Sequence, residues 1–397
     1  MNKRWVILGA AAALLVVGYL FGASLNIMDD AAIAGIYRQI LPELHSFEPL
    51  TQSSARALNA EGETIAYIGF SEQVGWGGNL LVGTIVEPET GTLRQPVLIE
   101  NHETPSFLAR VTSRLGMYQG LPATSVITPG QDIDTVTGAT ITNIAIANAV
   151  RETAHSIASG PLGLSPQPPP VEWYLGVAEI AAIAVFAAGF FVSQSSKLRK
   201  YRMTLLCINI FVLGFWLNRA LSVVQFSNLF LGIFPSPMTN PLFYIVLIGA
   251  LAPIFLLGKN LYCTYICPFC GLLEVTNKFG RNKSLGKSRK WLARLRYSLL
   301  FLLLLGAMVS ANANFLNFEP FGSTFGLDLN ISPILWIPVA FSIITGLFFR
   351  RLWCVALCPA GAMLDTIRDA VVDIRSRIKG RQCGTNKKTP HTGKDSI

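Results

Sequence analysis

The stretch YCTYICPFC occupies residues 262–270, and a related stretch, WCVALCPAG, occupies residues 353–361. Both consist of an aromatic residue, a cysteine, three further residues, a second cysteine and a proline, followed by two more residues. Each stretch follows a long apolar run and leads into a mixed segment of helical character. The recurrence predicts an internal repeat that brings two pairs of thiols to equivalent helix ends, where four sulfur ligands would meet at one site.

The spacing of these cysteines suits metal binding. Cysteines at positions i and i+4 share one face of a helix, and the proline after the second cysteine disfavours helical geometry there and marks a bend. A bend frees N–H groups that can donate to sulfur. Four thiolates suit an iron–sulfur cluster or tetrahedral zinc, and two unrelated pairs of structural or palmitoylated cysteines remain the alternative at this point. The candidate ligands are Cys263, Cys267, Cys354 and Cys358.

Three further cysteines lie outside these pairs. Cys270 has no counterpart in the second stretch, where Gly361 stands, so a role as substitute ligand is left open. Cys207 lies in an apolar run and is expected to be a buried thiol, as free cysteine usually is. Cys383 stands alone near the C-terminus and is expected to be incidental.

The composition is that of an integral membrane protein. Of the 397 residues, 51% are hydrophobic and only 14% are charged, which is too apolar for an ordinary soluble protein. Spans are predicted at 174–194, 203–223, 241–259, 297–313 and 332–349, each apolar enough to cross hydrocarbon. With an apolar run at residues 1–25 they make about six.

Charge is distributed unevenly along the chain. Residues 26–172 hold six arginines, no lysine and fifteen acids, a net charge of −9, so the rest carries +18 within the total of +9. The basic clusters adjoin apolar runs, which indicates cytoplasmic loops by the positive-inside rule and argues against nucleic-acid binding. This topology predicts that both cysteine motifs face the cytoplasm, where reduced thiols suit metal ligation.

The chain divides into five predicted parts. Residues 1–25 are an N-terminal anchor or signal, with the uncleaved anchor favoured because the run approaches spanning length. Residues 26–160 form an extracytoplasmic α+β domain, and 161–173 are a Pro/Gly linker. A membrane module follows at 174–366, and a basic cytoplasmic tail at 367–397.

Within the exported domain, strands are predicted at 79–86 and 93–100. Helices are predicted at 31–44, 107–120 and 143–156. Small residues and Gly138 before the last helix would let the backbone approach a ligand, and the helix start after Thr142 would offer N–H groups to a phosphate. A plain loop–helix junction capped by threonine gives the same pattern.

The segment DTVTGATIT at residues 134–142 resembles the flavinylation motif of the FMN-binding domains found in NqrC, RnfG and NosR. The resemblance covers about residues 46–160 and includes the GWGG at 75–78. It implies a covalent FMN whose phosphate is esterified to the Thr142 hydroxyl by a separate flavin transferase outside the cytoplasm. The loop before it would contribute Thr137, Gly138, Ala139 and Thr140; His102, Glu103 and Thr104 either line the flavin pocket or simply end a strand.

The second half of the chain resembles the membrane modules of the NosR/NirI and NapH families. The resemblance implies a cluster, 4Fe-4S rather than 2Fe-2S, bound by the four candidate cysteines at the cytoplasmic face. Zinc has no redox chemistry, so a flavin in the same chain also favours iron–sulfur. The order of the two parts points to NosR/NirI. Such proteins usually continue into a ferredoxin-like domain that has no counterpart after Cys383, so the usual electron relay is expected to be either missing or supplied by a separate ferredoxin-like subunit.

The expected fold class is thus an α-helical polytopic membrane protein with an α+β extracytoplasmic FMN-binding domain, located in a bacterial inner membrane. The resemblance implies transmembrane electron transfer between cluster and FMN, linked to quinol or a cytoplasmic reductant. The electrons would support a periplasmic reductase such as nitrous oxide reductase. A membrane redox sensor, or a maturation factor for a periplasmic metalloenzyme, are the alternatives.

Polar residues in the predicted spans are few. Glu179, Asn218 and Arg219 lie within or near spans, where polar groups either serve function or extend to the interface. All four histidines lie outside the predicted spans, which argues against an intramembrane haem with histidine ligands.

Overall fold

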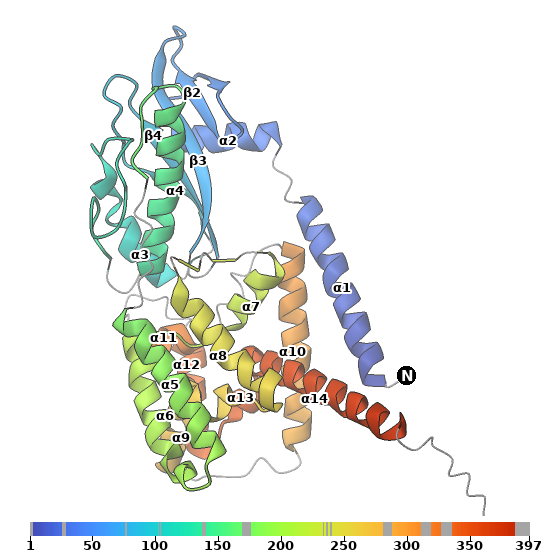
Figure 1. The fold of residues 1–397 in the computed structure, drawn as a ribbon. Coiled ribbons are helices and arrows are strands. Elements are labelled where there is room, and N and C mark those ends of the chain that lie inside the picture. The colour runs from blue at the N-terminus through green and yellow to red at the C-terminus, as the bar shows by residue number, and fades with distance from the viewer. Residues whose placement is uncertain are drawn as a thin grey trace, which may run out of the picture. The chain divides into compact units, whose positions relative to one another are not determined.

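A computed structural model of the chain describes residues 3–25, 29–75, 78–101, 103, 105–136, 140–168, 176–232, 234–235, 237–238, 240–280, 288–310, 319–326 and 336–385. The chain forms two compact units (Figure 1). The first comprises residues 1–176, 222–243 and 301–342, and the second comprises 177–221, 244–300 and 343–397.

The first unit is built on an antiparallel sheet of five strands, in which each strand pairs with its neighbour in the chain. The longest pairing joins the third and fourth strands, from Tyr67 opposite Val86 to Val74 opposite Asn79. The strands are β1 (Ser46–Pro49), β2 (Ser54–Leu58), β3 (Thr64–Val74), β4 (Asn79–Val86) and β5 (Val97–Asn101).

A helix covers each face of this sheet (Figure 1). Helix α2 (Asp30–Ile40) begins at Asp29, whose carboxylate accepts from the Ala32 N–H, and packs on the face that holds Ala66, Ile68 and Phe70. Helix α4 (Thr140–Ser159) packs on β3 and β4 on the other face. The side chains of alternate β3 residues thus pack in two separate cores, because successive side chains of a strand point to opposite faces of the sheet.

Smaller elements complete the first unit. Helix α3 (Pro105–Thr112) and a 3₁₀ turn at Leu115–Tyr118 follow the sheet. The short helices α7 (Val223–Phe230) and α11 (Phe321–Gly326) also belong to this unit. Helix α7 begins with a capping box, in which the Ser222 and Gln225 side chains satisfy each other's backbone N–H groups.

The helices and strands predicted for this domain match the structure only in part. Strand β4 matches the prediction of 79–86, but the strand predicted at 93–100 begins only at Val97. The predicted helix 107–120 is split into α3 and the 3₁₀ turn, and the helix predicted from 143 begins three residues earlier, at Thr140. Strands β1 to β3 were not predicted; β1 and β2 are too short to show a clear alternation.

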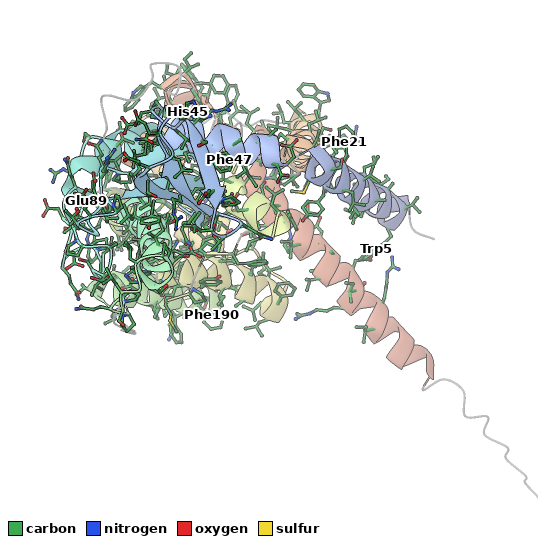
Figure 2. The ribbon with its side chains drawn as sticks, turned by 90° about the horizontal axis from the view of Figure 1, so that it is seen from above. Trp5, Phe21, His45, Phe47, Glu89 and Phe190 are labelled. Carbon is green, nitrogen blue, oxygen red and sulfur yellow. The ribbon has the colours of Figure 1, made fainter. Side chains whose placement is uncertain are left out.

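Three described helices are long and apolar enough to cross a membrane. They are α1 (Lys3–Leu25), α5 (Val177–Gln194) and α10 (Ser288–Ser310). Figure 2 shows Trp5 and Phe21 on α1, where Phe21 is 54% exposed, as expected of a side chain that faces lipid. Helices α8 (Pro241–Leu257) and α12 (Trp336–Phe348) are apolar but shorter. These helices are consistent with a polytopic membrane protein, but the predicted count of six spans is not confirmed.

The span predicted at 203–223 is interrupted in the structure. Helix α6 (Arg202–Asn209) passes into a π-helical segment at Ile210–Trp216, and Asn218 then adopts the left-handed conformation at φ 46°. An interruption of this kind shortens the regular helix. The predicted span is therefore not one continuous α-helix.

Both cysteine motifs lie in the second unit. The first is a π-helical segment at Tyr262–Ile266 followed by α9 (Pro268–Lys278), and the second is α13 (Leu352–Ala356) followed by α14 (Pro359–Thr385). Helix α14 runs on through most of what the sequence assigned to a tail from residue 367. Arg375 on this helix donates to the carbonyls of Phe255 and Leu256, which are at the C-terminal end of α8.

Candidate metal centre and flavin site

The two cysteine motifs have the same backbone hydrogen bonding. The N–H of Cys267 donates to the Tyr262 carbonyl at 2.8 Å, and that of Cys358 donates to the Trp353 carbonyl at 3.0 Å. Both bonds span five residues, the wider turn of a π-helix, which is frequent at functional sites. A proline then occupies the first position of α9 and of α14, where its missing N–H costs nothing.

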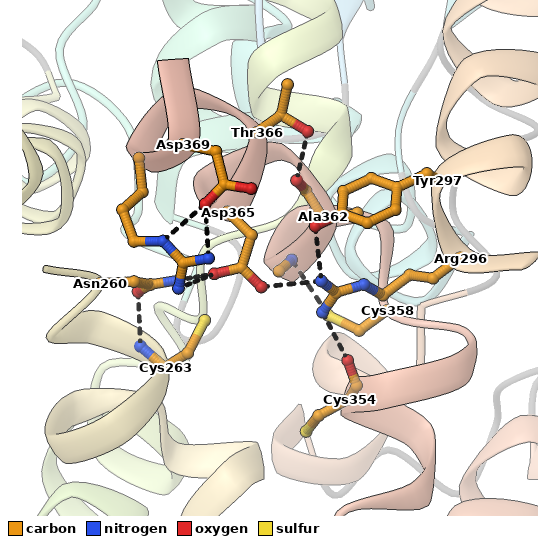
Figure 3. A network of polar contacts seen from close by, with 12 residues as sticks. Asn260, Cys263, Arg296, Tyr297, Cys354, Cys358, Ala362, Asp365, Thr366 and Asp369 are labelled. Carbon is orange, nitrogen blue, oxygen red and sulfur yellow. Dashed lines mark hydrogen bonds and ion pairs between the residues drawn. The ribbon is translucent and has the colours of Figure 1, made fainter. Parts of the chain in front are cut away.

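Five cysteine side chains, which we call the thiol cluster, come together in the second unit. The Cys270 and Cys354 sulfurs lie 3.2 Å apart, and Cys270 is also hydrogen-bonded to Cys267. A Cβ atom placed on Gly361 would lie 3.3 Å from the Cys358 sulfur and 3.9 Å from that of Cys263. The structure therefore brings the four predicted ligands together and adds Cys270; Figure 3 shows three of the five.

The thiols of the cluster are placed to hydrogen-bond with one another. In the described part of the chain, no three His, Cys, Asp or Glu side chains are arranged as ligands of a single metal ion. Burial raises the pKa of Cys263, and hydrogen bonding with Cys270 raises that of Cys354. The hydrogen bonds that Cys270 receives from Cys267 and Cys354 lower its own pKa. Bound iron or zinc would override this pattern, because a coordinating thiol is deprotonated.

A buried carboxylate in the first repeat forms ion pairs with three arginines. Glu274 on α9 has a side chain only 3% exposed, and lies 2.9 Å from the guanidinium groups of Arg202 and Arg350 and 2.7 Å from that of Arg351. Burial would raise the pKa of this carboxyl, but the arginines outweigh it and lower the pKa. The group carries an excess of positive charge next to Cys270.

The second repeat holds a matching carboxylate. Asp365 on α14 forms an ion pair with Arg296 at 2.7 Å and another with Arg368 at 3.2 Å, and it accepts from the Asn260 amide at 3.1 Å. Arg296 also donates to the Cys354 carbonyl at 2.8 Å (Figure 3). This network fixes the backbone of the second motif from the side of α10.

These contacts are reciprocal between the repeats. Glu274 and Asp365 each lie seven residues after the second cysteine of their motif, and Asn260 and Arg351 each lie three residues before the first. Asn260 of the first repeat binds Asp365 of the second, and Arg351 of the second repeat binds Glu274 of the first. The repeats thus cross-link one another on both sides of the thiol cluster.

The surroundings of the thiols fit an anionic metal–sulfur group. The buried Nη2 atom of Arg351 and the buried Nε atom of Arg296 have no hydrogen-bond acceptor among the described residues. The Gly361 N–H donates to the Cys358 sulfur at 3.3 Å, and the Cys270 N–H donates to that of Cys267. Unpaired buried donors are costly, and the sulfur atoms of an iron–sulfur cluster would accept from them. The donor set of cysteines also suits iron–sulfur chemistry.

The predicted flavin attachment residue is buried in the first turn of α4. Thr142 is 1% exposed, and its hydroxyl has no hydrogen-bond partner among the described residues. The sequence placed Thr142 just before the helix, but α4 begins at Thr140, so Thr142 lies inside it. A phosphate ester at this hydroxyl would still lie by the free N–H groups of a helix N-terminus, and it would remove an unpaired buried donor.

The other predicted flavin residues are only partly described. Glu103 is 3% exposed and packs on the turn between β3 and β4, where a Cβ on Gly75 would collide with its carboxylate. Thr140 is the first residue of α4. His102, Thr104, Thr137, Gly138 and Ala139 lie outside the described residues.

A cavity of about 180 Å³ lies beside the first turns of α4. It is smaller than the roughly 300–1,000 Å³ of usual ligand pockets, so it does not enclose a whole FMN. Thr142 does not line it. The lining residues are Gln73, Val74, Ile141, Ile144, Ala145, Asn148, Phe234, Pro235 and Asn240.

Glu179 and Arg219, the charged residues noted in the predicted spans, lie within electrostatic range of each other in the second unit. Cys207 is a free, half-buried thiol on α6. None of these three residues belongs to the thiol cluster.

Two protein-family descriptions match the chain. A 4Fe-4S binding domain matches residues 239–286 and again 331–382, so each cysteine motif falls in one copy. An FMN-binding domain matches residues 75–155, which include Thr142.

The chain is similar over part of its length to several known proteins. NirI of Paracoccus denitrificans is 25% identical over 47% of this chain, and the regulatory protein NosR of Stutzerimonas stutzeri is 25% identical over 52%. The chain is NosR/NirI-like. It spans less than a third of those relatives' length, 29% and 30% respectively. One component of an ion-translocating oxidoreductase complex from Methanosarcina acetivorans is 25% identical over 39% of the chain and 90% of its own length.

The NosR/NirI-like cysteine motifs did not by themselves identify their supporting side chains. Cys270, Glu274, Arg351 and Asp365 all lie at or next to the thiol cluster. One signal was available in the sequence: an acid recurs seven residues after the second cysteine in both copies. Cys270 carried no such signal, because it has no counterpart in the second copy.

Proposed function

We propose that this chain transfers electrons across a membrane between a cytoplasmic-side iron–sulfur cluster and an extracytoplasmic FMN. Cys263, Cys267, Cys354 and Cys358 would hold a 4Fe-4S cluster, and Thr142 would carry the FMN through a phosphoester. The FMN exchanges electrons singly or in pairs and the cluster singly. The observation that carries the proposal is the thiol cluster, formed from two repeats and flanked by buried arginine donors with no acceptor among the described residues.

The residues of the chain would act on the cluster's charge. Arg351 of the second repeat and Arg296 on α10 both approach the thiol cluster, and Glu274 and Asp365 hold these arginines in place. Fixed positive charge in a buried site stabilises the reduced, more negative cluster more than the oxidised one. The arrangement therefore favours electron uptake at this site.

The electron path needs a further carrier. The positive-inside rule places the cysteine motifs and the flavin domain on opposite sides of about 30 Å of hydrocarbon. A single transfer over that distance is implausibly slow. A quinone/quinol couple in the bilayer is the proposed carrier, with a ferredoxin-like subunit as donor and a periplasmic reductase, as in nitrous oxide reduction, as acceptor. A flavin transferase would attach the FMN. The host membrane would be a bacterial inner membrane.

The first test is a cofactor analysis of purified protein. The wild type is expected to contain both iron and covalently bound FMN. Thr142→Ala is expected to lose covalent FMN and keep iron, and Cys263→Ala to lose iron and keep FMN. Wild-type protein that holds stoichiometric zinc and no iron would contradict the proposal.

A redox sensor is the second candidate function, favoured by one observation. NosR of Stutzerimonas stutzeri is named a regulatory protein. A sensor would keep both cofactors without rapid electron exchange between them, and its variants would change transcript levels in cells. Fast exchange in the purified wild type would exclude a role as sensor alone.

A further inference from the structure

The first repeat carries an additional sulfur at a position that faces the thiol cluster in both repeats. Cys270 and Gly361 each lie three residues after the second cysteine of their motif. A Cβ on Gly361 would meet the sulfurs of Cys358 and Cys263 and the Nη1 atom of Arg296. A side chain at this position therefore points at the thiols, and only the first repeat places one there.

The additional sulfur is in contact with a proposed ligand of the other repeat. The Cys270 side chain is buried, at 4% exposure, and its sulfur lies 3.2 Å from that of Cys354. Cys354 belongs to α13 and Cys270 to α9, so the contact crosses between the repeats. Two sulfurs this close can reach the same iron atom with a small rotation of either side chain.

The surroundings of this pair suit a bound thiolate. Arg351 lies within electrostatic range of both Cys270 and Cys354. Its buried Nη2 atom is left without an acceptor among the described residues. Cys358 and Cys263 lie instead around Gly361, close to Arg296.

We propose that Cys270 and Cys354 are an exchangeable ligand pair for one iron of the cluster. This inference rests on the proposed function, because it presumes that the cluster is present. One sulfur binds the iron as thiolate while the other keeps the proton. Exchange breaks one Fe–S bond and forms the other, and the proton passes between the two sulfurs. No electron is gained or lost. The first repeat thus supplies a reserve ligand that the second repeat lacks.

The pairing predicts which cysteine can be lost without loss of iron. In Cys354→Ala, Cys270 takes the iron, so the iron content per polypeptide stays that of the wild type while the EPR spectrum of the reduced cluster shifts. In Cys270→Gly, which copies the second repeat, Cys354 holds the iron and the content is again unchanged. The double variant Cys270→Gly/Cys354→Ala leaves one iron without a thiolate and loses the cluster.

The experiment compares these variants with Cys358→Ala, a matched removal from the same repeat as Cys354. Iron is measured per polypeptide in the full-length protein reduced anaerobically, and the thermal unfolding midpoint in detergent reports whether each variant folds. Retained iron in Cys354→Ala, with loss in Cys358→Ala and in the double variant, supports the pair. Loss of iron in a folded Cys354→Ala variant overturns it, as does a double variant that keeps its iron.

A second variant guards against misfolding. Cys354→Ser preserves the side-chain size and a hydrogen bond to Cys270. If Cys354 is the sole ligand of its iron, the serine variant holds an oxygen ligand or none, whether or not Cys270 is present. The pair predicts instead that adding Cys270→Gly to Cys354→Ser changes the EPR spectrum, and an unchanged spectrum overturns it. Wild-type protein without iron would defeat the proposed function itself, a result distinct from either.

Discussion

At the scale of single residues, Thr142 is the side chain on which the flavin assignment depends. It is buried at the start of α4, and its hydroxyl has no partner among the described residues. Thr153 on the same helix is also buried with an unpaired hydroxyl in the described part of the chain, and it is therefore a matched control.

Thr142→Ala is expected to abolish covalent flavin, because no oxygen remains to form the phosphoester. Thr142→Ser keeps the oxygen and is expected to retain part of the flavin, and Thr153→Ala is expected to retain all of it. In-gel flavin fluorescence under denaturing conditions measures each. Full fluorescence in Thr142→Ala would place the attachment elsewhere.

Tyr37 gives the first unit a sensitivity to alkaline pH. Its ring lies in the core between α2 and the sheet, and burial raises its pKa from 10.0 to about 12. Because the pKa is raised in the folded state, the stabilisation is complete below pH 10 and is lost as pH rises toward 12. The loss is on the order of 2 kcal/mol.

Tyr37→Phe removes this titration and a buried hydroxyl that lacks a partner among the described residues. The variant is expected to match or exceed the wild type in stability at pH 8, and to lose less stability between pH 10 and pH 12. Denaturant unfolding followed by circular dichroism measures both. An equal alkaline loss in the two proteins would assign the sensitivity to other groups.

Functional residues that recur at a fixed spacing could be predicted from the sequence. Those that meet only in the folded chain could not. The four repeated cysteines could be found because their motif recurs with proline. Cys270 joins them only because α9 turns its sulfur toward Cys354, 84 positions away in sequence. Arg351 likewise meets Glu274 only once the two repeats are placed together.

At the scale of elements, the cross-links hold α9 against the second cysteine motif and α14 against the first. Glu274 forms more ion pairs than Asp365, because it partly neutralises three guanidinium groups. Glu274→Gln leaves those charges without a carboxylate in a buried site. Breaking a buried ion pair in this way costs about 3–5 kcal/mol, so a clear fall in Tm is expected.

The matched control for Glu274→Gln is Asp373→Asn, which removes the i,i+4 ion pair with the half-exposed Arg377 on α14. Exposed pairs of this kind contribute about 0.5 kcal/mol or less. Thermal unfolding of both variants in detergent, with iron content as a second readout, compares them. A fall in Tm no larger in Glu274→Gln than in Asp373→Asn would show that Glu274 does not hold the repeats together.

Some elements were predictable from their sequence patterns, but most of their ends were not. Strand β4, which is mainly apolar and buried, is the exception and was predicted with its bounds. The apolar run at 203–223 gave a span, but the π-helical segment at Ile210–Trp216 and the turn at Asn218 interrupt it. Apolar composition alone does not distinguish a regular helix from one with a wider turn.

At the scale of the whole molecule, the two candidate cofactor sites belong to different units. The first unit contains α4 with Thr142, and the second contains all five sulfurs of the thiol cluster. The match to an FMN-binding domain lies in the first unit, and the match to a 4Fe-4S binding domain lies mostly in the second. Electron transfer between the two is thus the property that requires the entire chain.

Electron passage across a sealed membrane is the property to measure most directly. Inside-out vesicles containing the full-length protein and a quinone expose the cytoplasmic face to dithionite, and the absorbance of the enclosed FMN is followed over time. The wild type is expected to show rapid FMN reduction. Cys263→Ala, which keeps FMN and lacks the cluster, is expected to show only the slow leak of reductant. Equal rates of FMN reduction in the two proteins would contradict electron transfer from cluster to flavin.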